Sequence, residues 1–285
     1  MRVLITGGAG QLGRDLADVL GSDAIPLSHR ELDIADAAAV EAAIKEHRPD
    51  AIVNCAAWTD VDGCEQDPAR ATLINATGAG NIARAAGDTL VVQISTDYVF
   101  DGRSEKPYVE SDPVNPVSEY GRSKLDGERA VAAAARRWAV VRSAWLYGTG
   151  TKNFVAAILR AARTRERLQV VDDQSGSPTS TPDLAGALVA LLVSGATGVL
   201  HGVNAGICSR WEFARAAFEI AGLDPQRVDP VPTSAMPRPA TRPAYAPMRG
   251  EAWRSAGLPE LRHWREALAE VVPGVLASLD AEAQT

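Results

Sequence analysis

The stretch Val3–Gly13, VLITGGAGQLG, decides the fold of this 285-residue chain. A short apolar run is followed by three glycines at the spacing Gly-x-x-Gly-x-x-Gly, and then by a helical pattern of leucines. Glycine allows a tight turn and lets the backbone approach a diphosphate, while the free N–H groups at a helix start attract the phosphates. We therefore predict a dinucleotide-binding turn made by Gly7, Gly10, Gln11, Leu12 and Gly13.

The rest of the first half alternates apolar runs with helix patterns. The predicted strands are 3–6, 24–27, 51–54, 90–95 and 138–143, and the predicted helices cover 37–46, a segment opened by Asp67-Pro68, and 118–137. Continuous apolar strands separated by helices are typical of a parallel sheet covered on both faces. The fold class we predict is α/β, a Rossmann-like doubly wound parallel sheet with a smaller C-terminal lobe.

The second half is less regular. Thr181-Pro182 opens a further helix, and Ser209-Arg-Trp-Glu212 is a capping box before another. Seven of the seventeen prolines lie between Pro225 and Pro247, so we predict a long loop region there rather than regular structure. We expect residues 1–147 to form an NADP(H)-binding domain, to which 165–204 return. We expect 148–164 and 205–285 to form a substrate-binding lobe.

Composition excludes several classes of protein. The net charge of −7 argues against nucleic-acid binding, and no apolar run reaches the length of a membrane span. Three cysteines without a regular spacing indicate free thiols, and the four histidines are scattered, so we predict no metal site. Because the chain shows no leader pattern, we expect a cytoplasmic protein.

The residues after the second predicted strand bear on the choice of coenzyme. NAD sites usually carry an acid there for the ribose 2′-hydroxyl, whereas this chain has Ser28, and Arg30 can face a 2′-phosphate. Glu31 follows too late in this interpretation, and Asp33 and Ile34 flank the adenine. We predict NADPH, with NADH possible; a solvated Arg30 is the alternative.

Tyr120 and Lys124 form a Tyr-x-x-x-Lys pair on the predicted long helix. Residues four apart share one helix face, and a nearby cation lowers the pKa of a phenol. A hydroxyl of Ser95 or Thr96, at the end of the fourth strand, is placed to polarise a carbonyl beside that phenol, because ligands bind outside the carboxyl ends of parallel strands. Thr96, Tyr120 and Lys124 are the predicted catalytic residues.

Seven segments together resemble the dTDP-4-dehydrorhamnose reductase family of the extended short-chain dehydrogenases/reductases. They are TGGAGQLG, RPDAIVNCAAWTDVDGCE, STDYVFDG, the YGRSKLDGE segment, RSAWLYG, DDQSGSPTS and VPTSAMPRPATRP. The resemblance implies hydride transfer from NADPH to the C4 keto group of a dTDP-linked 6-deoxysugar, with Tyr120 as proton donor.

The resemblance also implies which residues bind each ligand. Besides the glycine turn, the coenzyme contacts would come from Asp33, Ile34, Ala56, Ala57, Thr59, Tyr120 and Lys124. Ser28 and Arg30 are added on the chemical argument above, because the family often carries an acid where Ser28 stands. The substrate contacts would come from Val61, Thr96, Asp97, Tyr98 and Trp145. Independently of the resemblance, Arg242 of the proline-rich stretch is a candidate for the dTDP diphosphate, because a guanidinium matches phosphate geometry. Trp145 as a packing residue and Arg242 as a surface arginine remain open.

Two further points follow from the resemblance. Some relatives form dimers through a magnesium ion held by glutamates. In this chain the corresponding regions contain Asp15 and Pro182 instead. Magnesium binding is therefore uncertain, and we expect a monomer or weak homodimer. A dehydratase would carry Thr-Asp-Glu where this chain has Thr96-Asp97-Tyr98. An epimerase, a non-catalytic regulatory homologue and a reductase for another dTDP-4-keto sugar remain alternatives.

Overall fold

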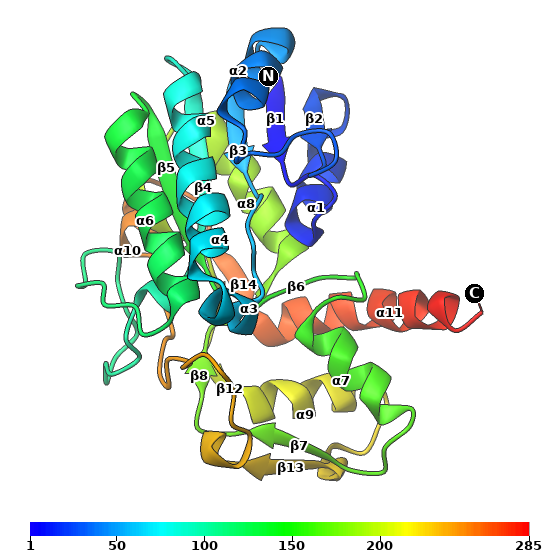
Figure 1. The fold of residues 1–285 in the computed structure, drawn as a ribbon. Helices are drawn as coiled ribbons and strands as arrows, with labels where there is room; N and C mark the ends of the chain where they lie inside the picture. The colour runs from blue at the N-terminus through cyan, green and yellow to red at the C-terminus, as the bar shows by residue number, and fades with distance from the viewer. Residues whose placement is uncertain (285) are drawn as a thin grey trace.

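The computed structural model describes residues 1–284 and contains a six-stranded parallel sheet in the order β10-β5-β4-β3-β1-β2 (Figure 1). The strands are β1 (Val3–Thr6), β2 (Ala24–Leu27), β3 (Ala51–Asn54), β4 (Leu90–Thr96), β5 (Trp138–Ser143) and β10 (Gly198–His201). The order runs outward in both directions from the neighbouring strands β1 and β3. This arrangement confirms the predicted Rossmann-like α/β fold.

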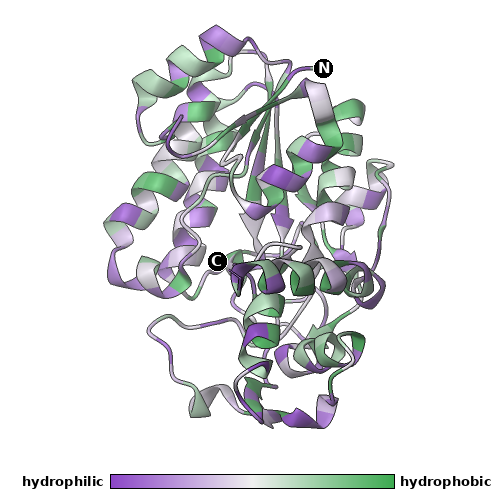
Figure 2. Ribbon diagram, turned by 90° about the vertical axis from the view of Figure 1, so that its right-hand side faces the viewer, coloured by the Kyte–Doolittle hydropathy of each residue, from purple (hydrophilic) through white to green (hydrophobic). Residues whose placement is uncertain are grey.

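Helices cover both faces of the sheet. One face packs on α1 (Gln11–Leu20) and α8 (Thr181–Ser194), and the other on α2 (Ala37–His47), α5 (Ala79–Ala85) and α6 (Glu119–Ala134). Successive strand residues point to opposite faces, so Val3 and Ile5 enter the first core and Leu4 the second. Figure 2 shows the apolar strands enclosed between helices whose outer faces are more polar.

Two short helices, α3 (Val61–Gln66) and α4 (Pro68–Thr72), follow β3, and a π-helical segment, Leu73–Gly78, joins α4 to α5. Asp67 caps α4 by accepting from the N–H of Arg70, with Pro68 at the first turn, as the sequence predicted.

A smaller part lies below the carboxyl ends of the sheet strands (Figure 1). Its core joins α7 (Phe154–Ala162), α9 (Arg210–Ile220), α11 (Trp264–Glu282), β7 (Leu168–Val171) and β13 (Val228–Val231). The short elements around it are β6 (Leu146–Tyr147), β8 (Ser175–Gly176), β9 (Thr179–Ser180), β11 (Asn204–Ala205), β12 (Cys208–Ser209) and β14 (Leu261–His263), while α10 (Glu251–Ser255) lies against the large sheet.

The boundary between the two parts differs from the expected residue numbers. Strand β7 pairs with β13, so the chain returns to the large sheet at α8 rather than from about residue 165. Trp253 of α10, expected in the lobe, instead packs in the core of the large sheet. Both assignments depend on contacts between segments far apart in the chain, which local patterns do not reveal.

The proline-rich stretch also differs from the expected loop. It contains β13, in which Pro230 is tolerated because β13 is half of a two-stranded sheet and leaves one edge unpaired. Asp173 then accepts from the N–H and hydroxyl of Thr233, which holds the following turn against the lobe.

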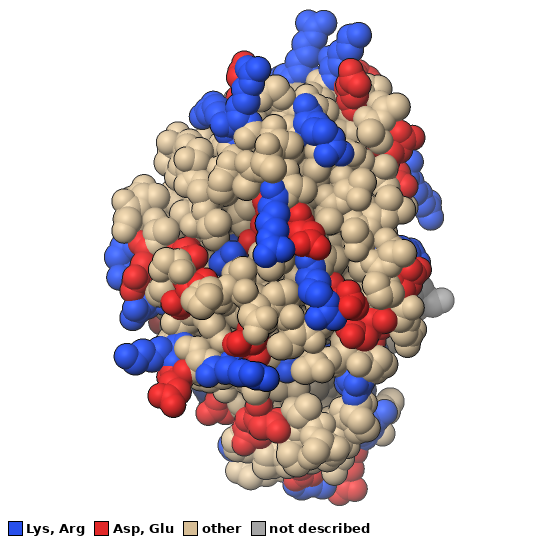
Figure 3. All heavy atoms as spheres, turned by 60° about the vertical axis from the view of Figure 1, so that its left-hand side comes forward, with Lys and Arg blue, Asp and Glu red and all other residues tan. Residues whose placement is uncertain are grey.

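Charged side chains of both signs are interspersed on the face shown in Figure 3. None of the helices in residues 1–284 combines the length and the apolarity that a bilayer crossing requires.

Candidate functional site

A cavity of about 660 Å³ is lined by residues at the carboxyl ends of the sheet strands and by residues of the smaller part. It is lined by most of the predicted site residues: Gly10, Gln11, Leu12, Gly13, Ala57, Thr59, Val61, Thr96, Asp97, Tyr98, Tyr120, Lys124 and Trp145. The others, namely Gly7, Ser28, Arg30, Asp33, Ile34, Ala56 and Arg242, do not line it.

The glycine turn forms one end of this cavity. Gly7 has φ +68°, and a Cβ at Gly13 would lie 2.5 Å from the carbonyl oxygen of Gly7, so any side chain there would open the turn. Gly10 caps α1 without a side-chain hydrogen bond, and the first turn of α1 contains no acid. The N–H groups at this helix start thus face the cavity without a side-chain acceptor from the cap, which fits an anionic diphosphate.

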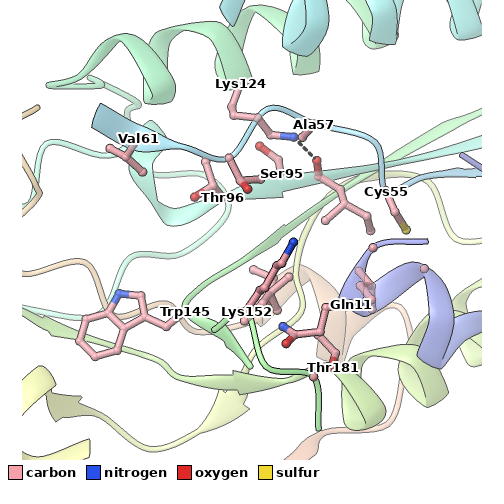
Figure 4. A pocket seen from close by; sticks show the side chains of 18 of the residues that line it. Gln11, Cys55, Ala57, Val61, Ser95, Thr96, Lys124, Trp145, Lys152 and Thr181 are labelled. Carbon is pink, nitrogen blue, oxygen red and sulfur yellow. Dashed lines mark hydrogen bonds between the residues drawn. The ribbon is translucent and has the colours of Figure 1, made fainter. Parts of the chain in front are cut away.

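Tyr120 and Lys124 of α6 are both buried at the cavity wall. The Lys124 Nζ donates a hydrogen bond of 2.7 Å to the carbonyl oxygen of Ile94 (Figure 4). Burial lowers the pKa of Lys124 to about 8, opposed by the nearby carboxylate of Glu128.

The sequence predicted that Lys124 would lower the pKa of Tyr120, but burial has the larger effect on the pKa of this phenol. Burial raises the pKa of Tyr120 above its usual value, and a hydrogen bond with Thr96 only partly opposes that shift. Tyr120 is therefore a neutral hydroxyl at physiological pH, suited to donate a proton rather than to accept one.

The structure distinguishes the two hydroxyls at the end of β4. Both residues line the cavity, but the Ser95 hydroxyl donates to the buried carboxylate of Glu128, whereas the Thr96 hydroxyl lies next to Tyr120. The Thr96 hydroxyl donates to Asp97 Oδ1 over 3.0 Å and accepts from the N–H of Tyr98. Of the two candidates, Thr96 is the one that can reach a ligand beside the phenol.

Asp97 and Trp145 show two features that the sequence did not indicate. Burial raises the pKa of Asp97 to about 6, and its Oδ2 is buried without a hydrogen-bond partner in the described chain. Trp145 has φ +48°, a left-handed conformation uncommon for a large side chain. Its ring lies against Gly176, where a Cβ would be 2.5 Å away, so the ring position depends on that glycine.

The residues predicted to select the coenzyme lie outside the cavity, after β2. The carboxylate of Glu31 lies beside the end of β2, where its Oε2 accepts a 2.8 Å hydrogen bond from the N–H of Ser28. Asp33 accepts from the N–H of Ala35, and Ile34 is buried.

Arg242 is engaged with a protein carboxylate. Its two terminal nitrogens donate to the two carboxylate oxygens of Asp62 over 2.6 and 2.9 Å, and one also donates to the carbonyl oxygen of Ala240. This pairing lowers the pKa of Asp62 and attaches the proline-rich stretch to α3.

Sequence reasoning missed three cations that line the cavity, Arg14, Lys152 and Arg210. Lys152 comes from the loop after β6 and extends into the cavity between Trp145 and Gln11 (Figure 4). Arg210 is the first residue of α9, and its guanidinium lies 3.6 Å from the centroid of the Trp145 ring. The capping box at Ser209 located the helix start, but nothing local showed that this start borders the cavity.

No group of three or more histidine, cysteine or acidic side chains suitable for a metal ion occurs within residues 1–284. Asp15 is half-buried, and burial raises its pKa against a hydrogen bond with Thr181.

A substitution at Gly121, next to Tyr120, tests how closely α6 packs against the backbone of Tyr98. A Cβ there would meet the backbone carbonyl oxygen of Tyr98 well inside van der Waals contact, so Gly121→Ala should lower the free energy of unfolding by about 1–3 kcal/mol. Gly186→Ala on α8 is the control, because nothing lies near its Cβ position, and it should be neutral or stabilising by about 0.5–1 kcal/mol. Urea denaturation measures both; equal stability of the two variants would contradict the tight contact.

Comparison with known proteins agrees with this geometry. The family model described as "RmlD substrate binding domain" matches residues 1–276. A dTDP-4-dehydrorhamnose reductase of Mycobacterium tuberculosis is 47% identical over 98% of this chain and 95% of its own. A dTDP-4-keto-6-deoxy-D-glucose reductase of Streptomyces niveus is 44% identical over 95% and 96%.

A crystal structure of the dTDP-4-dehydrorhamnose reductase of Bacillus anthracis in complex with NADP superposes with a TM-score of 0.92 at 37% identity, covering 95% of this chain and 98% of that one. The relatives match the chain almost from end to end, through the cavity-lining segments. The chain therefore belongs to the dTDP-4-dehydrorhamnose reductase family, a family of sugar-nucleotide reductases.

Proposed function

We propose that this chain reduces the C4 keto group of a dTDP-4-keto-6-deoxyhexose, converting dTDP-4-dehydro-L-rhamnose to dTDP-L-rhamnose, with NADPH as reductant. The observation that carries the proposal is that Thr96, Tyr120 and Lys124 border one cavity together with the glycine turn. Family membership and the NADP complex of the Bacillus anthracis relative support it.

The uncapped start of α1 is the part of this chain that would hold the coenzyme diphosphate. When bound, the nicotinamide supplies the hydride for the C4 carbon. The protein residues then have to place the sugar carbonyl, supply a proton and exclude water.

Tyr120 donates the proton to the C4 oxygen as negative charge develops there. Its raised pKa keeps the phenol protonated until the oxyanion forms. The neighbouring Thr96 hydroxyl, which donates to Asp97 Oδ1 in this structure, would redirect its single proton to that oxygen when the sugar is bound. The ammonium of Lys124, held by the Ile94 carbonyl, provides the positive charge at this wall of the cavity.

The charge of Lys124 predicts a pH dependence. Because burial lowers its pKa to about 8, the ammonium is present below that pH and is lost as the pH rises through it. We expect kcat/KM to be level between about pH 6.5 and 7.5 and to fall about tenfold for each pH unit above about 8, since only the protonated form acts. Steady-state rates from about pH 6 to 10 measure this; a profile that stays level well above the pKa of Lys124 would show that its charge is not required.

Arg30 predicts coenzyme preference. It is exposed next to Ser28, where a 2′-phosphate would approach if the adenosine binds after β2. Arg30→Gln should raise KM for NADPH about tenfold, the worth of one charge-assisted contact, and leave KM for NADH unchanged. Parallel assays with the two coenzymes measure it; a change of equal size for both would contradict a role in phosphate recognition.

The function itself is tested by NADPH oxidation with a panel of dTDP- and UDP-linked 4-keto sugars, followed by analysis of product stereochemistry. We expect the highest kcat/KM with dTDP-4-dehydro-L-rhamnose. Preference for dTDP-4-keto-6-deoxy-D-glucose, the sugar in the name of the Streptomyces niveus relative, would instead indicate a reductase for another deoxysugar. Absence of NADPH consumption with every sugar would refute the proposal.

We place the enzyme in the cytoplasm. Cys55, Cys64 and Cys208 are all free thiols, and the substrate and reductant are soluble cytoplasmic metabolites in this proposal.

A further inference from the structure

We propose that Arg210, stacked on Trp145, binds the diphosphate of the nucleotide-sugar substrate. This inference rests on the proposed function and adds a residue to the same site. It assigns to Arg210 the contact that the sequence assigned to Arg242.

The start of α9 holds Arg210 at the cavity. Ser209 accepts from the N–H of Glu212 while the Glu212 side chain accepts from the N–H of Ser209, so the capping box is complete. The N–H of Arg210 itself donates to the carbonyl oxygen of Gln174 over 3.1 Å. The backbone from which the guanidinium extends is therefore fixed on two sides.

Two aromatic rings orient the guanidinium. It lies 3.6 Å from the ring centroid of Trp145 and 5.2 Å from that of Phe154, within the range of cation–π attraction. Trp145 cannot shift easily, because its φ of +48° and the close approach of Gly176 fix the indole. Stacking occupies the faces of the guanidinium and leaves its N–H groups, which lie in its plane, available to acceptors.

The charge of Arg210 is not neutralised by direct contact. Within residues 1–284 no carboxylate lies within the 4.0 Å of an ion pair with Arg210, although Asp97 and the Tyr98 phenol influence it from farther away. Arg242 also interacts electrostatically with Tyr98, but its two terminal nitrogens donate hydrogen bonds to the carboxylate of Asp62. Arg210 is thus the arginine of this wall that can take up an added anion.

The position selects the substrate diphosphate over that of the coenzyme. In Figure 4, Trp145 lies toward one end of the cavity and Gln11, at the start of α1, toward the other, with Lys152 between them and Thr96 and Lys124 on the opposite side. The coenzyme diphosphate has its own site at α1, while Arg210 enters from the smaller part. A guanidinium matches the paired oxygens of a diphosphate.

The test measures binding of dTDP and of thymidine to the NADP⁺-saturated protein, by calorimetry for dTDP and NMR titration for thymidine. Arg210→Gln should weaken dTDP binding about ten- to a hundredfold, as expected for loss of charge-assisted hydrogen bonds, and Arg210→Lys should restore part of it. Thymidine, which has no phosphate, should bind all variants alike. Arg215→Gln is the matched control, because Arg215 lies on the same helix, 4.7 Å over the ring of Trp211, but lines a different cavity.

Each outcome of this experiment either supports or contradicts the role of Arg210. Unchanged dTDP affinity in Arg210→Gln overturns the inference, and so does an equal loss for dTDP and thymidine, which would mean that the cavity was distorted. If the unaltered protein binds no dTDP at all, the proposed substrate class fails. A selective loss of dTDP affinity that Arg215→Gln does not reproduce supports the inference.

Discussion

Replacing Tyr120 with Phe is expected to lower kcat by about a hundred- to ten-thousandfold, the usual contribution of a positioned acid. The substitution removes one hydroxyl from a buried ring that packs edge-to-face on Tyr98 at a centroid distance of 5.3 Å, so the fold of the site should persist. The affinity for NADPH should be unchanged, because the start of α1 is not altered. Stopped-flow rates and fluorescence titration with NADPH measure the two quantities.

Tyr108→Phe is the matched control. Tyr108 is equally buried and stacks on Phe100, and its hydroxyl donates to Asp101 over 2.8 Å, but it does not line the cavity. It should keep the rate of the unaltered enzyme. A Tyr120→Phe protein with a near-normal rate would refute proton donation by this phenol.

Replacing Glu128 with Ala is expected to lower the free energy of unfolding by about 3–5 kcal/mol. Glu128 of α6 forms a two-point ion pair with Arg142 of β5, at 2.9 and 2.7 Å, and both side chains are almost fully buried, with exposures of 6% and 5%. It also accepts the hydroxyl of Ser95. Without it, the guanidinium of Arg142 is left in the interior with no counter-charge, which is the costly outcome for a buried pair.

Asp88→Ala is the comparison for this effect. Asp88 pairs with Arg136 over 2.9 Å, but the side chains are 81% and 74% exposed, so its loss should change stability by less than about 1 kcal/mol. Urea denaturation of both variants measures the difference. Similar small losses would mean that solvent reaches Arg142 and replaces the carboxylate.

Local sequence patterns were sufficient to predict the sheet and the residues at the centre of the candidate site. Apolar runs and glycine spacing predicted β1, β3 and the turn before α1, since backbone conformation and the alternation of side chains are local properties. The four-residue spacing of Tyr120 and Lys124 likewise placed both on one face of α6, because helix geometry determines it. Which of Ser95 and Thr96 faces the ligand was not decided locally, because Glu128 takes the first of them from another element.

The sequence by itself thus determined the parallel sheet, the glycine turn before α1 and the phenol–ammonium pair, each of which depends on residues a few positions apart. Only the tertiary structure decided that β7 belongs to the smaller part, that Asp62 occupies Arg242, and that Arg210 stacks on Trp145. These outcomes join residues about 60 to 180 positions apart, and they depend on which charges and rings the packed core brings into contact.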